Sequence, residues 1–428
     1  MQNREFTAER FGINVLFCSV FLNHIKLKKV LYTCCLCIIT VTLSSFAKPE
    51  AWGFYGHRLI NRMAVYTLPP ELIGFYKKHI EYMTEHAVDP DKRRYATKHE
   101  GVRHYIDIDH WDKIPFPNVP RDFEEAIIKH CKIRFISGTD SLYFDKVITA
   151  DSVMLKTDYF DGIKLIVDYP TFVKYWKRVI KPFYYEDEWR LSGYDLDELF
   201  GTTYFQRNKI NVLIEDHFSQ YGIVPYHLEA TQIKLTKAFE RKDLDMVLRI
   251  SAEFGHYIGD AHVPLHTTSN YNGQLTNQVG IHAFWESRIP ELFAESEYDF
   301  FVGKADYIDN PREYFWNIII KAHSHLDSVL LVEKRLSKTF DTDLQYCYDE
   351  RLGQTIRIQC PEYTKAYTKA LGSMVEEQMR ASIHAIGSCI YTAWVDAGQP
   401  VITKDEKIQV TVEEIKPDTN VKARAHDN

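Results

Sequence analysis

The sequence predicts an all-α protein, a bundle of many helices with one less regular insert. Three observations favour this fold class. Apolar residues recur every three or four positions over long stretches, and prolines stand where several of these stretches begin. In addition, 45% of the 428 residues are hydrophobic, which is enough for a sizeable core.

The helical pattern extends over most of the chain that follows the N-terminal region. Segments with this apolar spacing cover residues 56–68, 69–86, 225–242, 243–262, 311–336 and 361–398. Asp243 stands at an N-cap position, and Gly398 is a stop signal for the last segment. We therefore expect helices to build the main body of the protein.

An insert at about residues 131–210 departs from this pattern. Residues 131–170 are rich in β-branched and turn-forming residues, so we expect short strands or an irregular segment. Residues 171–185 interleave aromatic with basic side chains. That pattern suits either a stacking face for nucleic acid or an amphipathic helix with a buried aromatic stripe, which is the commoner arrangement.

Residues 1–51 are expected to be an N-terminal extension followed by a signal peptide. Lys26, Lys28 and Lys29 precede the uncharged stretch 30–46, and small residues follow it. This order is typical of a secretory signal, so we expect a secreted or periplasmic protein. The uncharged stretch is also close to the minimum length of a spanning helix, and if uncleaved it would anchor the protein to a membrane.

The rest of the chain divides into a helical domain at residues 52–400 and a polar, weakly ordered tail at 401–428. The formal net charge of −7 excludes a broad basic surface of the kind that binds duplex DNA. The cysteines that follow residue 51 are Cys131, Cys347, Cys360 and Cys389. They allow two disulfides in any of three pairings, or free buried thiols.

Two histidine–carboxylate pairs lie close together in the sequence. His256 and Asp260 are four residues apart, and so are His282 and Glu286. Residues at this spacing project from the same face of a helix. One such pair alone is usually structural, but two neighbouring pairs indicate a metal site.

A turn between the two pairs adds a further imidazole. Pro264 ends or bends the preceding helix near Val263, so the chain can turn and bring His266 back toward the same cavity. Imidazole nitrogen and carboxylate oxygen are ligands that zinc prefers. Matching side chains occur elsewhere, namely Asp89, Asp91 and His104, and also Trp52 and His57 just after the expected signal peptide.

Five short motifs follow one another in a fixed order. They are Trp-Gly-x-x-Gly-His from residue 52, Pro-Asp-x-x-Arg from residue 90, His-Tyr-Ile-Asp from residue 104, the His256–His266 stretch, and His-x-x-x-Glu from residue 282. In this combination the chain resembles the trinuclear-zinc superfamily that contains bacterial zinc-dependent phospholipases C and the single-strand-specific zinc nucleases of fungi and plants. The resemblance covers residues 52–112 and 225–293, and it does not cover 131–210. It implies a helical bundle around a cleft with three zinc ions per chain.

The resemblance also implies which residues hold each metal. The first zinc would be held by Asp91, His104, His256 and Asp260. The second would be held by His266, His282 and Glu286. The third would be held by the main chain of Trp52, by His57 and by Asp260 as a bridge.

Two of these assignments carry alternatives. Asp91 matches the Pro-Asp-x-x-Arg motif, and Asp89 is the other candidate for the first zinc. The terminal amine of Trp52 is available only if cleavage follows Ala51. Cleavage after Ala47 agrees better with the usual small-residue rule, but it would leave four extra residues.

The implied function is that of a zinc-dependent phosphodiesterase in which a zinc-activated water attacks phosphorus. Asp91 would orient this water and take its proton. Arg94 would contact a phosphate oxygen or form a surface ion pair, and Tyr105 would line the substrate pocket or pack in the core. Glu286 is the form of this ligand found in the phospholipases, so phospholipid head groups are the favoured substrate and single-stranded nucleic acid is the alternative.

A function of another class is also consistent with the sequence, namely a non-catalytic binding protein whose helices are cross-linked by zinc. For the phospholipase interpretation we expect a phosphodiester substrate and transient contact with a membrane surface. Nothing in the sequence indicates an obligate protein partner.

Overall fold

The structure is a computed structural model whose described residues belong to one unit, Trp52–Asn428. It describes residues 54–94, 96–97, 99–149, 152–156, 165–179, 188–351 and 354–402. The expected signal peptide, Trp52 and most of the polar tail lie outside these residues. Within the described ranges, no helix combines the length and apolar character that crossing a membrane requires.

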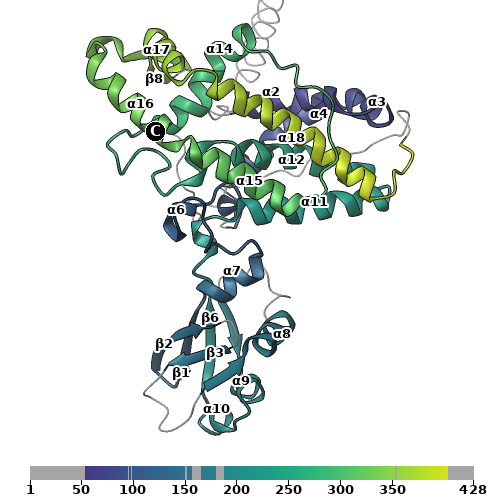
Figure 1. Cartoon of the computed structure of the whole chain (residues 1–428), viewed down its shortest axis with the longest axis vertical. Coiled ribbons are helices and arrows are strands. Elements are labelled where there is room, and N and C mark those ends of the chain that lie inside the picture. The colour runs from purple at the N-terminus through teal and green to yellow at the C-terminus, as the bar shows by residue number, and fades with distance from the viewer. Residues whose placement is uncertain are drawn as a thin grey trace, which may run out of the picture. The chain divides into compact units, whose positions relative to one another are not determined.

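Helix α12 (Leu244–Ala261) lies at the centre of the helical body (Figure 1). Its C-terminal half is buried on all sides, as expected for a helix surrounded by other helices. The helices that contact it include α2 (Phe54–Ala64), α4 (Ile80–Glu85), α11 (Val224–Glu240), α15 (Pro311–Ser324) and α18 (Met374–Asp396). The predicted N-cap is confirmed, because the Asp243 side chain accepts a hydrogen bond from the main-chain N–H of Met246.

Other helices complete the body and its connections. The longer ones are α3 (Pro70–Lys78), α7 (Phe123–His130), α14 (Ile289–Glu297), α16 (Leu326–Thr339) and α17 (Pro361–Leu371). The shorter ones are α5 (Asp89–Arg93), α6 (Ile108–Trp111), α13 (Ile281–Ala283) and the π-helix η7 (Phe284–Arg288). Single 3-10 turns are η1 (Val65–Thr67), η2 (His86–Val88), η3 (Gly101–Arg103), η5 (Ser219–Tyr221), η6 (Pro264–Thr267) and η8 (Thr342–Leu344).

Three of the predicted helical segments are each divided into two helices. Segment 69–86 breaks between α3 and α4, at His79. Segment 311–336 breaks between α15 and α16, next to His325. Segment 361–398 breaks between α17 and α18, where Gly372 has a φ of 68° that an α-helix cannot continue through. Gly398 follows the end of α18, as its stop signal predicted.

The insert shows that the all-α prediction was too narrow. It contains a six-stranded antiparallel sheet in the order β4-β3-β2-β1-β6-β5. The strands are β1 (Lys132–Ser137), β2 (Asp140–Ile148), β3 (Ser152–Lys156), β4 (Leu165–Asp168), β5 (Glu188–Leu191) and β6 (Asn211–Glu215). In β1 the side chains of Ile133 and Phe135 are buried and Lys132 is exposed, which is the two-residue period of a strand. The sheet extends past the expected end of the insert at residue 210.

Helices α8 (Tyr169–Val179), α9 (Gly193–Phe200) and α10 (Tyr204–Arg207) accompany this sheet. Three aromatic side chains of α8, namely Phe172, Tyr175 and Trp176, are buried in the hydrophobic core, and Tyr169 is partly buried against it. The structure therefore agrees with the amphipathic-helix interpretation of this segment. Within residues 171–179, which the structure describes, no aromatic ring is exposed for stacking on nucleic acid, and residues 180–185 of the segment lie outside the described residues.

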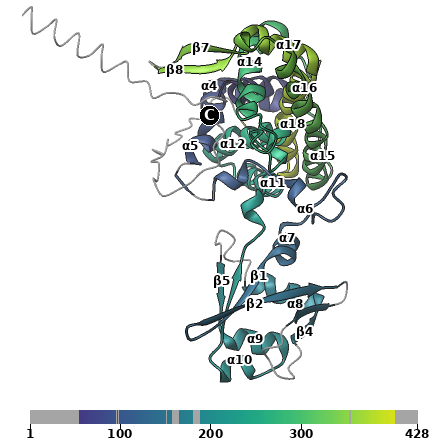
Figure 2. The same ribbon diagram turned by 90° about the vertical axis from the view of Figure 1, so that its left-hand side faces the viewer.

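A second, two-stranded sheet is formed by β7 (Tyr346–Arg351) and β8 (Gln354–Gln359), which extend as a hairpin beside α17 (Figure 2). A disulfide joins Cys347 in β7 to Cys360 just before α17, with 5.0 Å between their Cα atoms. Cys131 and Cys389 are free and buried. Of the two states that the sequence left open, disulfide and free buried thiol, each is therefore found for two of these four cysteines.

Candidate metal centre

Eight of the predicted metal ligands converge in the helical body. They come from α2 (His57), α5 (Asp91), the end of η3 (His104), α12 (His256 and Asp260), η6 (His266), α13 (His282) and η7 (Glu286). Within each of three sets of these side chains, candidate ligand atoms lie within 4.8 Å of one another. The sets are His57, His256 and Asp260; Asp91, His104 and His256; and His266, His282 and Glu286, so the first two share His256. The clusters are therefore able to hold metal ions.

Local chain geometry explains how the segment between the two pairs folds back. Helix α12 ends at Ala261, and the turn η6 begins at Pro264, as the proline predicted. The main-chain oxygen of His266 accepts a hydrogen bond from the N–H of Ile106 at 2.9 Å. The segment that carries His104 is thereby held against the turn that carries His266.

The first donor group consists of Asp91, His104, His256 and Asp260. Asp260 Oδ2 lies 2.9 Å from His104 Nδ1 and 3.3 Å from His256 Nε2, and these two nitrogens are 3.1 Å apart. Asp91 Oδ1 lies 3.8 Å and 3.7 Å from the same nitrogens. In a tetrahedral zinc site with bonds of about 2.0–2.1 Å, the donor atoms are about 3.3 Å apart. The first donor group has the spacing of such a site.

The second donor group consists of His266, His282 and Glu286. Glu286 Oε2 lies 2.7 Å from His282 Nε2 and 3.4 Å from His266 Nε2. The Nδ1 atoms of the two histidines face main-chain carbonyl oxygens, at 2.6 Å for His266 and 3.0 Å for His282. Because a carbonyl only accepts hydrogen bonds, Nδ1 carries the proton in each ring and Nε2 keeps its lone pair toward the group.

The third donor group consists of His57, Asp260 and Glu286. His57 Nε2 lies 3.4 Å from Asp260 Oδ1 and 3.3 Å from Glu286 Oε1. Asp260 therefore presents one oxygen to the first group and the other to the third, as a bridging ligand does. Glu286 divides its two oxygens between the second and third groups in the same way, which the sequence analysis did not foresee.

Burial and neighbouring charges prepare these groups to bind cations. Burial and the surrounding imidazoles lower the pKa of His104 and of His256 well below the usual value, so both are neutral near pH 7. Burial and the carboxylate of Glu286 raise the pKa of Asp260 well above its usual range. Burial alone would raise the pKa of Glu286 too, but His266 lowers it well below the usual value. Ionised carboxylates crowded in a buried site would be stabilised by positive charge.

Glycines on α12 allow His57 to reach the centre. A Cβ atom built at Gly259 would lie 2.9 Å from His57 Nδ1 and 2.8 Å from Ile60, which is closer than real Cβ contacts. One turn earlier, a Cβ at Gly255 would collide with Asn61. The close packing of α2 against α12 therefore depends on these two glycines.

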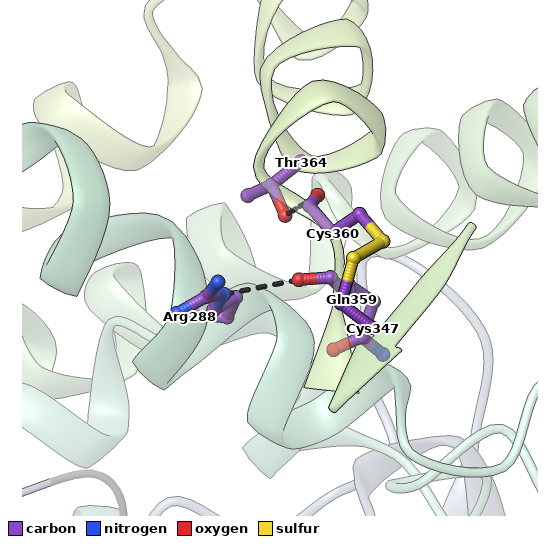
Figure 3. The surroundings of a disulfide bond; sticks show 5 residues. All are labelled: Arg288, Cys347, Gln359, Cys360 and Thr364. Carbon is purple, nitrogen blue, oxygen red and sulfur yellow. Dashed lines mark hydrogen bonds between the residues drawn. A yellow bond between two sulfur atoms is a disulfide. The ribbon is translucent and has the colours of Figure 1, made fainter. Parts of the chain in front are cut away.

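The helix that carries Glu286 is braced by the disulfide-linked hairpin. Arg288, two residues after Glu286, donates from Nε to the main-chain oxygen of Gln359 at 3.1 Å (Figure 3). Gln359 precedes Cys360, which is joined to Cys347. One hydrogen bond therefore links the disulfide-bonded segment to the helix that carries Glu286.

Asp89 is the predicted ligand that lies away from the donor groups. Its carboxylate contacts His86 Nδ1 at 2.5 Å and Lys92 Nζ at 2.9 Å. Asp91 is therefore the aspartate that the structure brings to the centre, as the Pro-Asp-x-x-Arg motif favoured. Trp52 lies outside the described residues.

The predicted substrate contacts have mixed outcomes. Arg94 lies beside the centre with Nη2 3.1 Å from Asp91 Oδ1, and it is 5% exposed, so its ion pair is buried and not on the surface. Tyr105 is buried, and its hydroxyl donates to the main-chain oxygen of Gln220 at 3.2 Å. This is the packed-core alternative for that tyrosine.

Sequence reasoning missed a buried carboxylate behind the first donor group. Glu100 is 2% exposed and accepts hydrogen bonds from Arg103 Nη1 at 2.9 Å and from the hydroxyl of Tyr257. The only sequence signal was its position four residues before His104, and a single acidic residue at that spacing is too common to single out.

Comparisons with models of protein families, with curated proteins and with solved structures find no match for this chain. Membership of the trinuclear-zinc superfamily therefore stays a prediction. The case for a metal centre depends on the geometry of the donor groups.

Proposed function

We propose that this protein is a zinc-dependent phosphodiesterase of the phospholipase C type, and that it acts outside the cytoplasm after removal of a signal peptide. One observation carries the proposal. Asp260 and Glu286 each divide their two oxygens between different donor groups, so three cations would be held side by side. Adjacent cations suit a phosphodiester, because the phosphate oxygens carry the charge that must be neutralised.

The donor set supports zinc as the metal. It combines imidazole nitrogens with carboxylate oxygens, and the first donor group has tetrahedral spacing. The Nε2 lone pairs of His266 and His282 point toward the second donor group. Zinc bound here would supply Lewis acidity toward a phosphate oxygen and would lower the pKa of water to about 7.

Asp91 and Arg94 would act on the substrate side. Asp91 is 16% exposed, whereas the side chains of His104, His256 and Asp260 are at most 2% exposed. The Asp91 carboxylate is therefore the member of the first group that solvent reaches most easily, which favours a role in taking the proton of the attacking water. Arg94 holds this carboxylate in place and adds positive charge beside the phosphate.

Two features favour a lipid head group over single-stranded nucleic acid. Within the described part of the segment that suggested a stacking surface, the rings of Phe172, Tyr175 and Trp176 are buried. The net charge of −7 would also repel a polyanion. The nuclease is therefore the second candidate within the same chemistry.

The test compares two aspartates on the same short helix. The mature protein, loaded with zinc, is assayed on phosphatidylcholine vesicles and on single-stranded DNA. Asp91→Asn should lower kcat by about 100-fold or more, whereas Asp89→Asn, whose carboxylate lies outside the donor groups, should remain close to wild type.

Each other outcome has a defined meaning. Cleavage of DNA alone would indicate the nuclease. If zinc raises the thermal stability and neither substrate is hydrolysed, the non-catalytic binding protein is the correct interpretation. If zinc does not bind at all, the proposed metal centre is wrong.

A further inference from the structure

Glu100 is a buried acidic residue that the proposed reaction does not use. It stands directly before η3 and is 2% exposed. One oxygen, Oε2, accepts from Arg103 Nη1 at 2.9 Å and lies 3.4 Å from Arg93 Nε. The other oxygen, Oε1, accepts from the hydroxyl of Tyr257. The carboxylate is therefore held from several sides.

The same carboxylate faces the ring of His104 from behind. His104 turns its Nδ1 atom toward the first donor group, so its Nε2 atom points away from that group. Nε2 is buried and has no hydrogen-bond partner among the described residues. The carboxylate oxygen that faces it is Glu100 Oε1, at 4.0 Å. This is longer than a hydrogen bond, so the two groups must approach each other by about 1 Å to form one.

We propose that Glu100 is a positioning residue for His104. In this arrangement the ring donates its Nε2 proton to Glu100 Oε1, which leaves Nδ1 without a proton and directed at the metal. A cation bound at Nδ1 draws electron density from the ring and makes the Nε2 proton a stronger donor, so metal binding and this hydrogen bond strengthen each other. The inference rests on the proposed metal centre and names one residue that supports it.

The surrounding charges explain why the carboxylate would be in place before any metal arrives. Arg93 donates to both oxygens of Glu253, at 2.7 Å and 2.9 Å, and its Nε faces Glu100. The hydroxyl of Tyr257, one residue after His256 on α12, ties the same carboxylate to the central helix. A residue whose own partners are ordered can direct a ligand at little entropic cost.

A purely structural role is the alternative, in which Glu100 only neutralises two partly buried arginines, Arg93 and Arg103. That role predicts a loss of stability with no specific effect on the metal. The matched control is Glu253→Gln. Glu253 shares Arg93 with Glu100, and its carboxylate forms ion pairs with Arg93 and Arg249 and belongs to none of the donor groups. Both variants remove one carboxylate from Arg93, and only Glu100→Gln removes the carboxylate behind His104.

The experiment measures zinc affinity by competition with a chromophoric chelator and records the visible spectrum of the cobalt-substituted protein. Glu100→Gln should weaken one of the bound metals by about 10- to 100-fold and shift the cobalt bands. Glu253→Gln should leave both readouts at the wild-type values. Glu100→Asp keeps the charge but shortens the side chain, so its zinc affinity should lie between those of Glu100→Gln and the wild type. It replaces Glu100→Gln if that variant does not fold.

Failure of the inference and failure of the proposed function give different results. If the wild type binds metal and the Glu100 variants match it in affinity and spectrum, Glu100 is structural only, even if they melt at a lower temperature. If the wild type binds no zinc and no cobalt, the metal centre itself is wrong.

Discussion

The Asp260→Asn substitution should stabilise the metal-free protein and at the same time weaken metal binding. Asp260 is 1% exposed, and burial together with the charge of Glu286 raises its pKa well above 3.8. An ionised carboxyl at this position destabilises the metal-free fold because it loses hydration and faces like charge. Asparagine has nearly the same shape without the charge, so this penalty disappears.

The size of the gain follows from the pH. If the pKa of a carboxyl in the folded state is above the pH, the protein folds with that carboxyl protonated. The free-energy penalty of burying Asp260 therefore cannot exceed the cost of protonating an ordinary aspartate at that pH. At pH 7 this limit is about 4 kcal/mol, since each of the roughly three pH units above 3.8 costs about 1.4 kcal/mol. The lost contact with His104, 2.9 Å from Asp260 Oδ2, subtracts about 1 kcal/mol. We therefore expect a net gain of about 1–3 kcal/mol.

The pH dependence has a definite sign. Because the folded state binds the proton of Asp260 more tightly than the unfolded state, the penalty exists only above the unfolded pKa. The advantage of the variant should therefore be largest at neutral pH, shrink as the pH falls, and vanish near pH 4. Urea unfolding in the presence of a chelator, between pH 4 and 8, measures this difference.

Metal binding should change in the opposite direction. Zinc at a thousand times its dissociation constant stabilises a protein by about 4 kcal/mol per site. Asp260 serves the first and third donor groups, so the variant should retain only the zinc of the second group. Metal analysis after gel filtration should give about one zinc per chain for the variant, against the expected three for the wild type.

A second buried aspartate provides the control. Asp197, 8% exposed, accepts hydrogen bonds from the main-chain N–H groups of Phe205 and Gln206, at 3.0 Å and 2.8 Å. Asp197→Asn should therefore destabilise the protein and leave its zinc content unchanged. The reasoning is refuted if Asp260→Asn lowers the stability of the metal-free protein at pH 7 and keeps the wild-type zinc content.

Three further predictions follow from the packing. In Gly259→Ala the added Cβ would lie 2.9 Å from His57 and should displace it, so metal analysis should find one zinc fewer than in the wild type. Gly74→Ala has open space around the added Cβ and should bind zinc normally. Equal zinc content in the two variants would contradict the argument. In the Asp260→Asn background, the stability of the metal-free protein against urea should fall as the pH drops below about 6.5. Burial lowers the pKa of His104, His256 and His227, so the unfolded chain binds more protons than the folded one in this range. A stability that does not change with pH would contradict this prediction. Cys347→Ser should lower stability by up to about 3 kcal/mol and speed proteolysis of the β7–β8 hairpin, whereas unchanged cleavage would show that the disulfide does not restrain it.

Local sequence spacing predicted the parts of the centre that depend on one helix or one turn. The pairs His256/Asp260 and His282/Glu286 are set by helical periodicity, and the turn before His266 is set by Pro264. The buried aromatic stripe of α8 also follows a local pattern. The fold class was too narrow because the β-branched segments could not be assigned to strands until their pairing was known.

The sequence by itself determined which chemical groups are available and which neighbours share a face. Only the tertiary structure decided between Asp89 and Asp91, because residues two apart on a helix point in different directions and packing selects one of them. Packing likewise turned the second oxygen of Glu286 toward His57 and placed Glu100 behind His104. Such contacts join residues far apart in the chain, and their distances depend on how closely whole helices approach one another.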